Sequence, residues 1–224
     1  MLLVEGGTSR IIEVDRAGKI AKEIKLTTDP KVTAHNQYRG TRKTKDGHYL
    51  VCFKGEGKVV ELDGDGKVLR AIKVPGDPHE VVPLPDGHLL ITCGDGHKVI
   101  ELDADEKVVW ELNENDLPGN TLRLMAGCQR LPNGNTVFCN YLGHGHLGEQ
   151  PHVFEITREK TDQTPRGKLT PTLVGTEQQI TDNLKRYQDA GMTMPLLWPP
   201  FSGTPTAKTL VDMRRLVHDI LPKI

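Results

Sequence analysis

The chain has 224 residues, a length that suits one large domain or two small ones. Charged residues make up 26% of it, and the formal net charge of −1 argues against the basic stripe of a nucleic-acid-binding protein. No apolar run approaches the roughly 18 residues that a transmembrane helix needs, so neither nucleic acid nor membrane is expected as a partner.

The beginning of the chain and its cysteines predict a compartment. "MLLVEGGTSRIIEVD" lacks the basic segment and the long apolar run of a secretory signal. The four cysteines show no CxxC spacing and fall in predicted strands, so we expect buried, reduced thiols; they are Cys52, Cys93, Cys128 and Cys139. The sequence as given therefore predicts a cytoplasmic protein, with an extracytoplasmic location as the alternative if an upstream segment is missing.

Three series of short motifs recur in step along residues 1–160. The first series is "IIEVD" (11–15), "VVELD" (59–63), "VIELD" (99–103) and "VFEIT" (153–157). The second is "KDGHYLV" (45–51), "PDGHLLI" (85–91) and "PNGNTVF" (132–138). The third is "AGKIAKEI" (17–24), "DGKVLRAI" (65–72) and "DEKVVWEL" (105–112). Asx-Gly pairs supply the positive φ of tight hairpins, and four short strands per repeat of about 40–50 residues are typical of a β-propeller blade.

The predicted fold class is mainly β: a partial β-propeller of three to four four-stranded blades, followed by a C-terminal βαβα segment. The second and third blades are complete, at 36–74 and 78–112. The first blade lacks its innermost strand, with strands at 2–6, 10–15 and 19–26. The fourth blade lacks its outermost strand, with strands at 124–131, 135–141 and 151–157.

An open arc of blades leaves unpaired strand edges, which proteins normally cover. Three explanations remain open. A homodimer closes the ring, the C-terminal part covers an edge, or the chain is a fragment.

Residues 2–158 resemble bacterial quinoprotein-like (PQQ-like, NHL-like) propellers. The most specific piece is "RLPNGNTVFCNYLGHGHLGEQPHVFEITREK". The resemblance implies the propeller fold strongly and an activity only weakly, because propellers host many functions. No motif corresponds to the residues that hold the quinone in true quinoproteins, so no quinone is expected.

Ligands of propellers usually bind at the channel mouth, near the inner strands. Counting back seven residues from the Asx of each hairpin turn marks Arg39, His79 and Ala126 as equivalent positions, and His35 lies just upstream of the first. Arginine offers a bidentate fork to carboxylate or sulfate, so Arg39, His79 and His35 predict a site for a small anionic ligand. The alternative is a wet channel whose polar residues bind only water.

Other polar clusters carry weaker predictions. His144, His146 and His152 lie close together in the glycine-rich segment 141–152 and are weak candidates for a metal site, which we do not expect because no third ligand is fixed. "ELDGDG" and "ELDADE" lack EF-hand spacing and predict hairpin turns. His48 and His88 follow the turn glycines and are expected to be structural. No nucleophile–base arrangement, and hence no catalytic residue, is predicted.

The pattern changes after a predicted linker at 161–168. "LTPTLVG" reads as a strand, and "TEQQITDNLKRYQDAG" reads as a helix with Thr176 as N-cap and Gly191 past its end. "MTMPLLWPPF" is a continuous apolar strand, and a second helix follows from Pro205. Residues 169–224 are therefore predicted to form a βαβα segment.

This segment resembles the C-terminal end of bacterial luciferase-like flavin-dependent monooxygenases, which are TIM barrels. The motif that carries the resemblance is "LVGTEQQITDNLKRYQDAGMTMPLLWPPF". It implies that Gly175, Thr176 and Glu177 lie where FMN phosphate is often held. The match spans only about 55 residues, whereas a barrel needs about 250. No cofactor is therefore expected, with FMN implied only if the resemblance is functional.

Three hypotheses follow for function. The first is a non-catalytic propeller module that binds a small, in particular anionic, ligand or a protein partner. The second is a protein related to flavin-dependent monooxygenases and oxidoreductases. The third is a chimeric or fragmentary reading frame without a joint function. Whether the chain is an enzyme stays open, and the incomplete barrel favours the non-enzyme.

Overall fold

The computed structural model describes residues 1–146, 149–164, 181–182 and 185. The chain divides into two compact units, 1–166 and 167–224. In the second unit Thr181, Asp182 and Lys185 are helical, in agreement with a helix at that place. The rest of the predicted βαβα segment lies outside the described residues and stays a prediction. No helix among the described residues is long and apolar enough to span a membrane.

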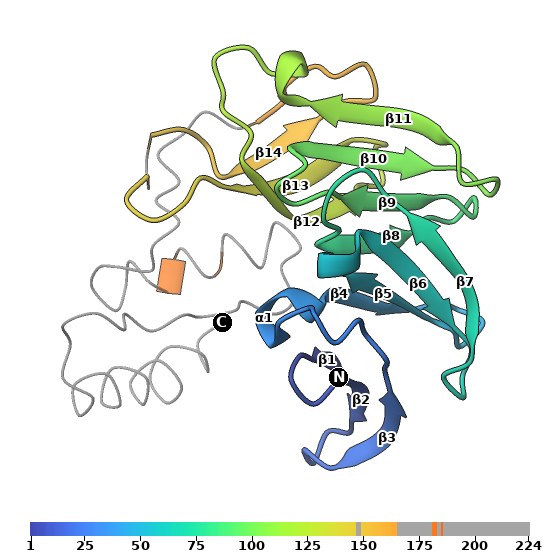
Figure 1. The fold of residues 1–224 in the computed structure, drawn as a ribbon. Helices are drawn as coiled ribbons and strands as arrows, with labels where there is room; N and C mark the ends of the chain where they lie inside the picture. Colours follow the sequence, from blue (N-terminus) through green and yellow to red (C-terminus); the bar gives the residue numbers. More distant parts are fainter. Residues whose placement is uncertain (147–148, 165–180, 183–184, 186–224) are drawn as a thin grey trace, which may run out of the picture. The chain divides into compact units, whose positions relative to one another are not determined.

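The first unit consists of four antiparallel sheets, here called blades 1 to 4, which follow one another in chain order (Figure 1). Blade 1 contains β1 (Leu2–Glu5), β2 (Arg10–Val14) and β3 (Ile20–Lys25). Blade 2 contains β4 (Tyr38–Lys43), β5 (Tyr49–Phe53), β6 (Lys58–Leu62) and β7 (Val68–Lys73). Blade 3 contains β8 (Glu80–Pro83), β9 (Leu89–Thr92), β10 (Lys98–Leu102) and β11 (Val108–Asn113). Blade 4 contains β12 (Leu124–Arg130), β13 (Thr136–Tyr141) and β14 (Val153–Ile156).

Short helical turns connect these strands: α1 (Ala34–Gln37) precedes β4, η1 (Lys54–Glu56) follows β5, and η2 (Glu114–Asp116) follows β11. The propeller-like arrangement is confirmed, and within the described residues blade 1 has the three strands predicted for it.

One aspartate organises the hairpin between the last two strands of each of the first three blades: Asp15, Asp63 and Asp103. In blade 2 the N–H groups of Asp65 and Lys67 both donate to Oδ1 of Asp63, at 2.9 Å. The other two hairpins repeat these bonds. Because the side chain satisfies the turn's own N–H groups, the turn is specified by local sequence.

Blade 4 repeats this turn with a threonine. The N–H of Thr161 donates to Oγ1 of Thr157 at 3.1 Å, and Asp162 then forms an antiparallel bridge with Ile156. This bridge has the same sequence separation as the first pair beyond the turn in the other blades. The predicted linker thus begins with residues that still pair with blade 4. No further strand of this blade is seen in the described part of the chain.

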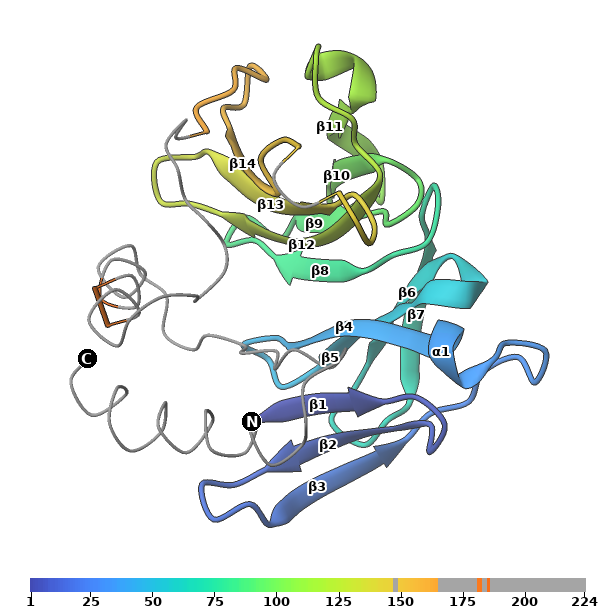
Figure 2. The ribbon, with the colours of Figure 1, turned by 90° about the vertical axis from the view of Figure 1, so that its left-hand side faces the viewer.

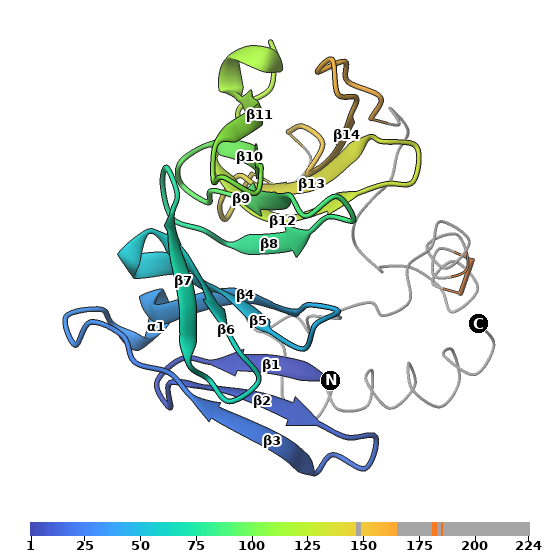
Figure 3. The same ribbon diagram turned by 90° about the vertical axis from the view of Figure 1, so that its right-hand side faces the viewer.

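Stacking of neighbouring blades creates three apolar cores. The inner strands lie side by side in the order β4, β8, β12, as Figures 2 and 3 both show. β9 illustrates the result, because all four of its residues are buried between the blades on either side. In a continuously apolar strand such as "LLIT", both faces of the sheet are therefore packed.

Blade 4 shows a different pattern because one of its faces is open. Phe138 and Phe154 stack at 5.3 Å between ring centroids on the face toward blade 3 and are fully buried. On the opposite face Cys139 is exposed. The prediction of four buried thiols is therefore wrong for Cys139. Its place corresponds to that of Cys52, which is 0% exposed because blade 3 covers it.

Two glycines in β-bulges show how closely blades approach. Gly40 donates its N–H to the carbonyl of His79 at 2.8 Å. A Cβ at Gly40 would lie 2.6 Å from Oε1 of Glu80 and 2.8 Å from that carbonyl. Gly127 occupies the corresponding bulge of blade 4, and a Cβ there would meet no described atom within 4 Å.

We expect Gly40→Ala to destabilise the fold by about 1–3 kcal/mol, because the added methyl forces blades 2 and 3 apart. Gly127→Ala is the matched control and should change stability by less than about 0.5 kcal/mol. Urea unfolding measures both. Equal effects of the two substitutions would contradict the close packing inferred at Gly40.

Candidate ligand site at the ends of the inner strands

A cluster of charged side chains lies where blades 2 and 3 begin their inner strands. Arg39 is the second residue of β4, His35 belongs to α1, and Lys54 belongs to η1. Asp77 and His79 lie in the segment that leads into β8. These are loop ends of stacked blades, a place where propeller side chains from different sheets meet.

Asp77 is the centre of this cluster. Its Oδ2 lies 3.3 Å from Nζ of Lys54 and 3.3 Å from Nε2 of His79. Nη2 of Arg39 lies 3.4 Å from Nε2 of His35, and Nη1 of Arg39 donates to the carbonyl of Tyr38 at 2.8 Å.

Backbone geometry holds Asp77 in place. The N–H of Asp95 donates to Oδ1 of Asp77 at 2.6 Å. Gly94, just before Asp95, has a φ of +45°, and a Cβ there would lie 2.6 Å from both Asp77 and His79. Only glycine allows this approach, so the backbone of the "CGDG" turn of blade 3 lies in direct contact with Asp77 and His79.

Two buried polar atoms of the cluster have no aligned hydrogen-bond partner: Oδ2 of Asp77 and Nε2 of His79. Their mutual 3.3 Å contact is an ion-pair distance without hydrogen-bond geometry. Buried polar atoms in folded proteins almost always have partners, and an exception points to a bound water, ion or ligand. This pair therefore marks the place where a further polar group fits.

Burial also shifts the ionisation of the cluster. The pKa of His79 is lowered, chiefly by burial, although Asp77 opposes the shift. Burial likewise lowers the pKa of Arg39, again opposed by Asp77. Two cations, Arg39 and Lys54, therefore face one carboxylate, and His79 tends toward its neutral form.

The structure thus brings together the three residues predicted from sequence, Arg39, His79 and His35. The equivalence of the positions by counting is only approximate, because a bulge inserts a residue in β4 and β12 but not in β8. Arg39 and Ala126 lie in those bulges, whereas His79 precedes the first ladder pair. Lys54 and Asp77 were missed, since a single lysine or aspartate in a loop carries no spacing signal.

A second polar cluster, also missed, joins blades 3 and 4. Glu101 is 2% exposed, and its Oε2 accepts hydrogen bonds from both Arg130 and Arg158. Its Oε1 lies 2.9 Å from Nδ1 of His88, which raises the pKa of that imidazole. Both guanidinium groups also lie over the ring of Trp110. Glu101 therefore acts as an ion-pair hub between blades.

His88, Glu101 and the nearby Asp86 offer ligand atoms within 4.8 Å of one another, an arrangement that could hold a metal ion. Glu101 is, however, already paired with Arg130 and Arg158, and these two guanidinium groups would repel a bound cation. We interpret the group as part of the ion-pair network. His48 occupies the equivalent position in blade 2 and contacts Glu61 at 2.9 Å, so both turn histidines have a structural contact.

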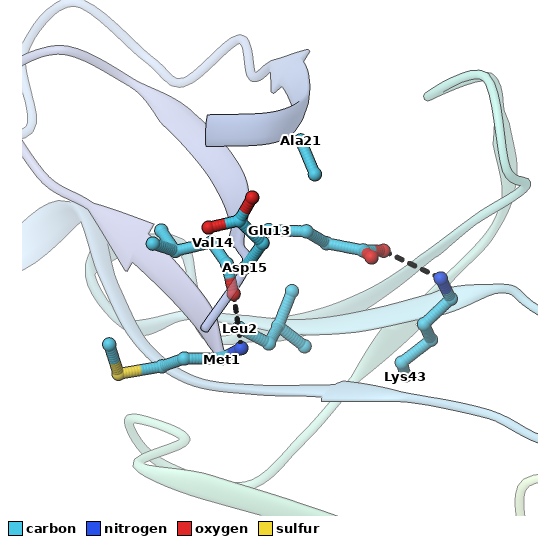
Figure 4. Close-up of a pocket in the computed structure, with 7 residues that line it drawn as sticks. All are labelled: Met1, Leu2, Glu13, Val14, Asp15, Ala21 and Lys43. Carbon is cyan, nitrogen blue, oxygen red and sulfur yellow. Dashed lines mark hydrogen bonds and ion pairs between the residues drawn. The ribbon is translucent and has the colours of Figure 1, made fainter. Parts of the chain in front are cut away.

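The corresponding glutamate of blade 1 uses the same arrangement. Lys43 of blade 2 reaches Oε1 of Glu13 at 2.6 Å, and the hydroxyl of Tyr49 donates to the same oxygen. The contact borders a shallow hollow of about 380 Å³ (Figure 4). A comparable hollow of about 220 Å³ borders Glu101. Both hollows lie at blade junctions, away from the Asp77 cluster.

The remaining candidates do not converge. Nδ1 of His146 lies 3.0 Å from Glu149, and His144 packs edge-on against Tyr141. Among the described residues, the three histidines of segment 141–152 form no group that could share a metal ion. Gly175, Thr176 and Glu177 lie outside the described residues, so the site implied by the luciferase-like resemblance stays a prediction.

Comparison with known proteins gives the fold. No family model matches the chain, and no curated protein matches it. A protein of unknown function from Bacteroides caccae is 31% identical, with a TM-score of 0.59 over 67% of this chain and 56% of its own. Streptogramin B lyase is 17% identical, with a TM-score of 0.55 over 75% of this chain and 52% of its own.

A third similar structure is a catalytically inactive variant of virginiamycin B lyase from Staphylococcus aureus with quinupristin. It is 14% identical, with a TM-score of 0.52 over 75% of this chain and 56% of its own. At this identity the lyases share the fold alone. The chain spans about half the length of the structures it matches. These matches support a propeller-like β fold and provide no support for the luciferase-like resemblance.

We expect Glu101→Gln to destabilise the protein by about 3 kcal/mol, because Glu101 is buried and its loss leaves Arg130, whose side chain is only 14% exposed, without a counter-charge. Glu61→Gln is the matched control, since its partners His48 and Arg70 are about one-third exposed. It should cost less than about 1 kcal/mol. Chemical unfolding compares them, and equal losses would refute the hub.

The two histidines should respond oppositely to pH. The pKa of His79 lies below 6.5 in the folded protein, so stability is full above 6.5 and falls as the pH decreases below it. The pKa of His88 lies above 6.5, so its contribution is full below 6.5 and is lost as the pH rises through the folded-state value.

Urea unfolding between about pH 5 and 8 tests this opposition. His79→Asn should lessen the loss of stability on the acid side. His88→Asn should remove stability mainly on that same side. If both substitutions altered the pH dependence of stability in the same direction, the assigned pKa directions would be wrong.

Proposed function

We propose that this protein is a non-catalytic binding module that holds a small organic anion at the Asp77 cluster. The observation that carries the proposal is that Arg39 and Lys54 both interact with Asp77, whose Oδ2, like Nε2 of His79, is buried without a hydrogen-bond partner. Arg39 and Lys54 would take the negative group, and Oδ2 of Asp77 would accept a hydrogen bond from a hydroxyl or amine of the ligand.

The same geometry favours binding over catalysis. A general base must reach its substrate, and Nε2 of His79 is buried against Asp77 instead. The resemblance in fold to streptogramin B lyases therefore does not extend to a proposed lyase activity. The proposed binding needs no cofactor, and flavin chemistry rests on the luciferase-like resemblance alone.

Arg39→Gln should weaken binding of the anion roughly tenfold or more, because it removes a charged hydrogen-bond donor. Calorimetric titration with sulfate, acetate and lactate, at constant ionic strength, measures the affinity. Lactate should bind more tightly than acetate if Asp77 receives its hydroxyl.

Arg42→Gln is the matched control. Arg42 lies on the same strand, is 46% exposed at its side chain and pairs with Glu80. Its loss should leave anion affinity unchanged. Failure of all three anions to bind the unmodified protein, or equal loss in both variants, would refute the site.

A further inference from the structure

The outward face of blade 4, the face opposite blade 3, exposes side chains that the other blades bury. Val153 is 52% exposed, and Tyr141 is 39% exposed. The ladder places Val153 where β6 has Val59 and β10 has Val99, and both of those are 0% exposed. Neighbouring blades cover the equivalents, so this face has the composition of a blade interface, and no other described strand packs on it.

The polar residues of this face also match those of the covered interfaces. Glu155 occupies the place of Glu13 and Glu101, which receive Lys43 and Arg130 from the following blade. In the described residues, Glu155 accepts bonds only from amide groups of its own blade, with Asn135 at 2.7 Å. Its carboxylate is therefore free to meet a cation from a partner.

Blade 1 has an outward face at the other end of the arc. Leu3 is 38% exposed there, whereas its equivalents Val51 and Ile91 are 0% exposed. Val14 is half-buried, whereas its equivalent Leu62 is 2% exposed. The two end blades thus expose the two complementary sides of the same kind of interface. Blade 4 exposes the side that elsewhere meets the following blade, and blade 1 exposes the side that elsewhere meets the preceding blade.

We propose that two copies of this chain associate head to tail, with the outward face of blade 4 of each copy packing on the outward face of blade 1 of the other. The matched structures are about twice as long as the part that this chain covers, so a second copy supplies a comparable amount of propeller. Two identical head-to-tail contacts close a ring and stop further growth. This proposal is independent of the anion site.

The test uses the full chain and its native thiol. Cys139 lies on the outward face of blade 4, whereas Cys52, Cys93 and Cys128 are buried and report that the chain is folded. Partial burial among the surrounding strands raises the pKa of the Cys139 thiol, so labelling with a thiol reagent is carried out at alkaline pH. Sedimentation velocity measures the mass over a range of concentrations.

We expect a dimer whose Cys139 is protected, and which becomes reactive on dilution into monomers. Val153→Asp and Leu3→Asp should each weaken association roughly tenfold or more, because each buries a charge in an apolar contact. Val68→Asp is the matched control: this valine is 57% exposed on the outer strand β7, and its replacement should leave association unchanged.

Three outcomes would overturn the proposal. A monomer with a reactive Cys139 shows that the face is free, and a monomer with a protected Cys139 shows that the chain covers it itself. A dimer with a reactive Cys139 that persists in both Val153→Asp and Leu3→Asp uses another surface.

Discussion

The structure depends on one constraint: a blade whose two faces are both apolar is stable only between two neighbours. In blades 2 and 3 the second and third strands are buried on both sides, and they pair with each other in the same register in both blades. The three apolar cores are therefore products of stacking, and no blade has a core of its own. The polar features of the molecule arise at the edges of these contacts.

Glutamates at the blade junctions show how polarity is accommodated there. The equivalent strands β2, β6, β10 and β14 carry a glutamate at the same place, and these glutamates have different partners. Glu13 meets a lysine of the next blade, and Glu101 meets an arginine there, whereas blade 3 has Pro83 at that position and Glu61 turns to Arg70 of its own blade. Glutamates at one ladder position thus form ion pairs either within a blade or between blades. Only the pairs between blades add to the contact of neighbouring blades.

The sequence was informative where structure is local. The hairpin turns, the strands and the incomplete first blade follow from Asx-Gly pairs and period-two alternation, since these act within a few residues. Arg39 and His79 were predicted to share a site because the repeat places them at equivalent points, and His35 was included because it lies just upstream of Arg39. Lys54, Asp77 and the Glu101 hub were not predicted, because each pairs with a residue of the neighbouring blade that no motif marks. Cys139 was predicted to be buried because its motif resembles that of Cys52. The motif carries no information on whether another blade packs on the strand.

The self-contained turns have a consequence for how such chains change over evolution. Each hairpin satisfies its own backbone groups, through Asp63 or Thr157 for example, so a blade can be copied or lost as a unit without disturbing its loops. The junction glutamates restrict this freedom. Pro83, the last residue of β8, stands where blades 2 and 4 carry Lys43 and Arg130, and Glu61 of the preceding blade pairs instead with Arg70 of its own blade. Exchanging blades would therefore leave a junction glutamate opposite a residue that cannot pair with it, so charge matching ties each blade to its neighbour.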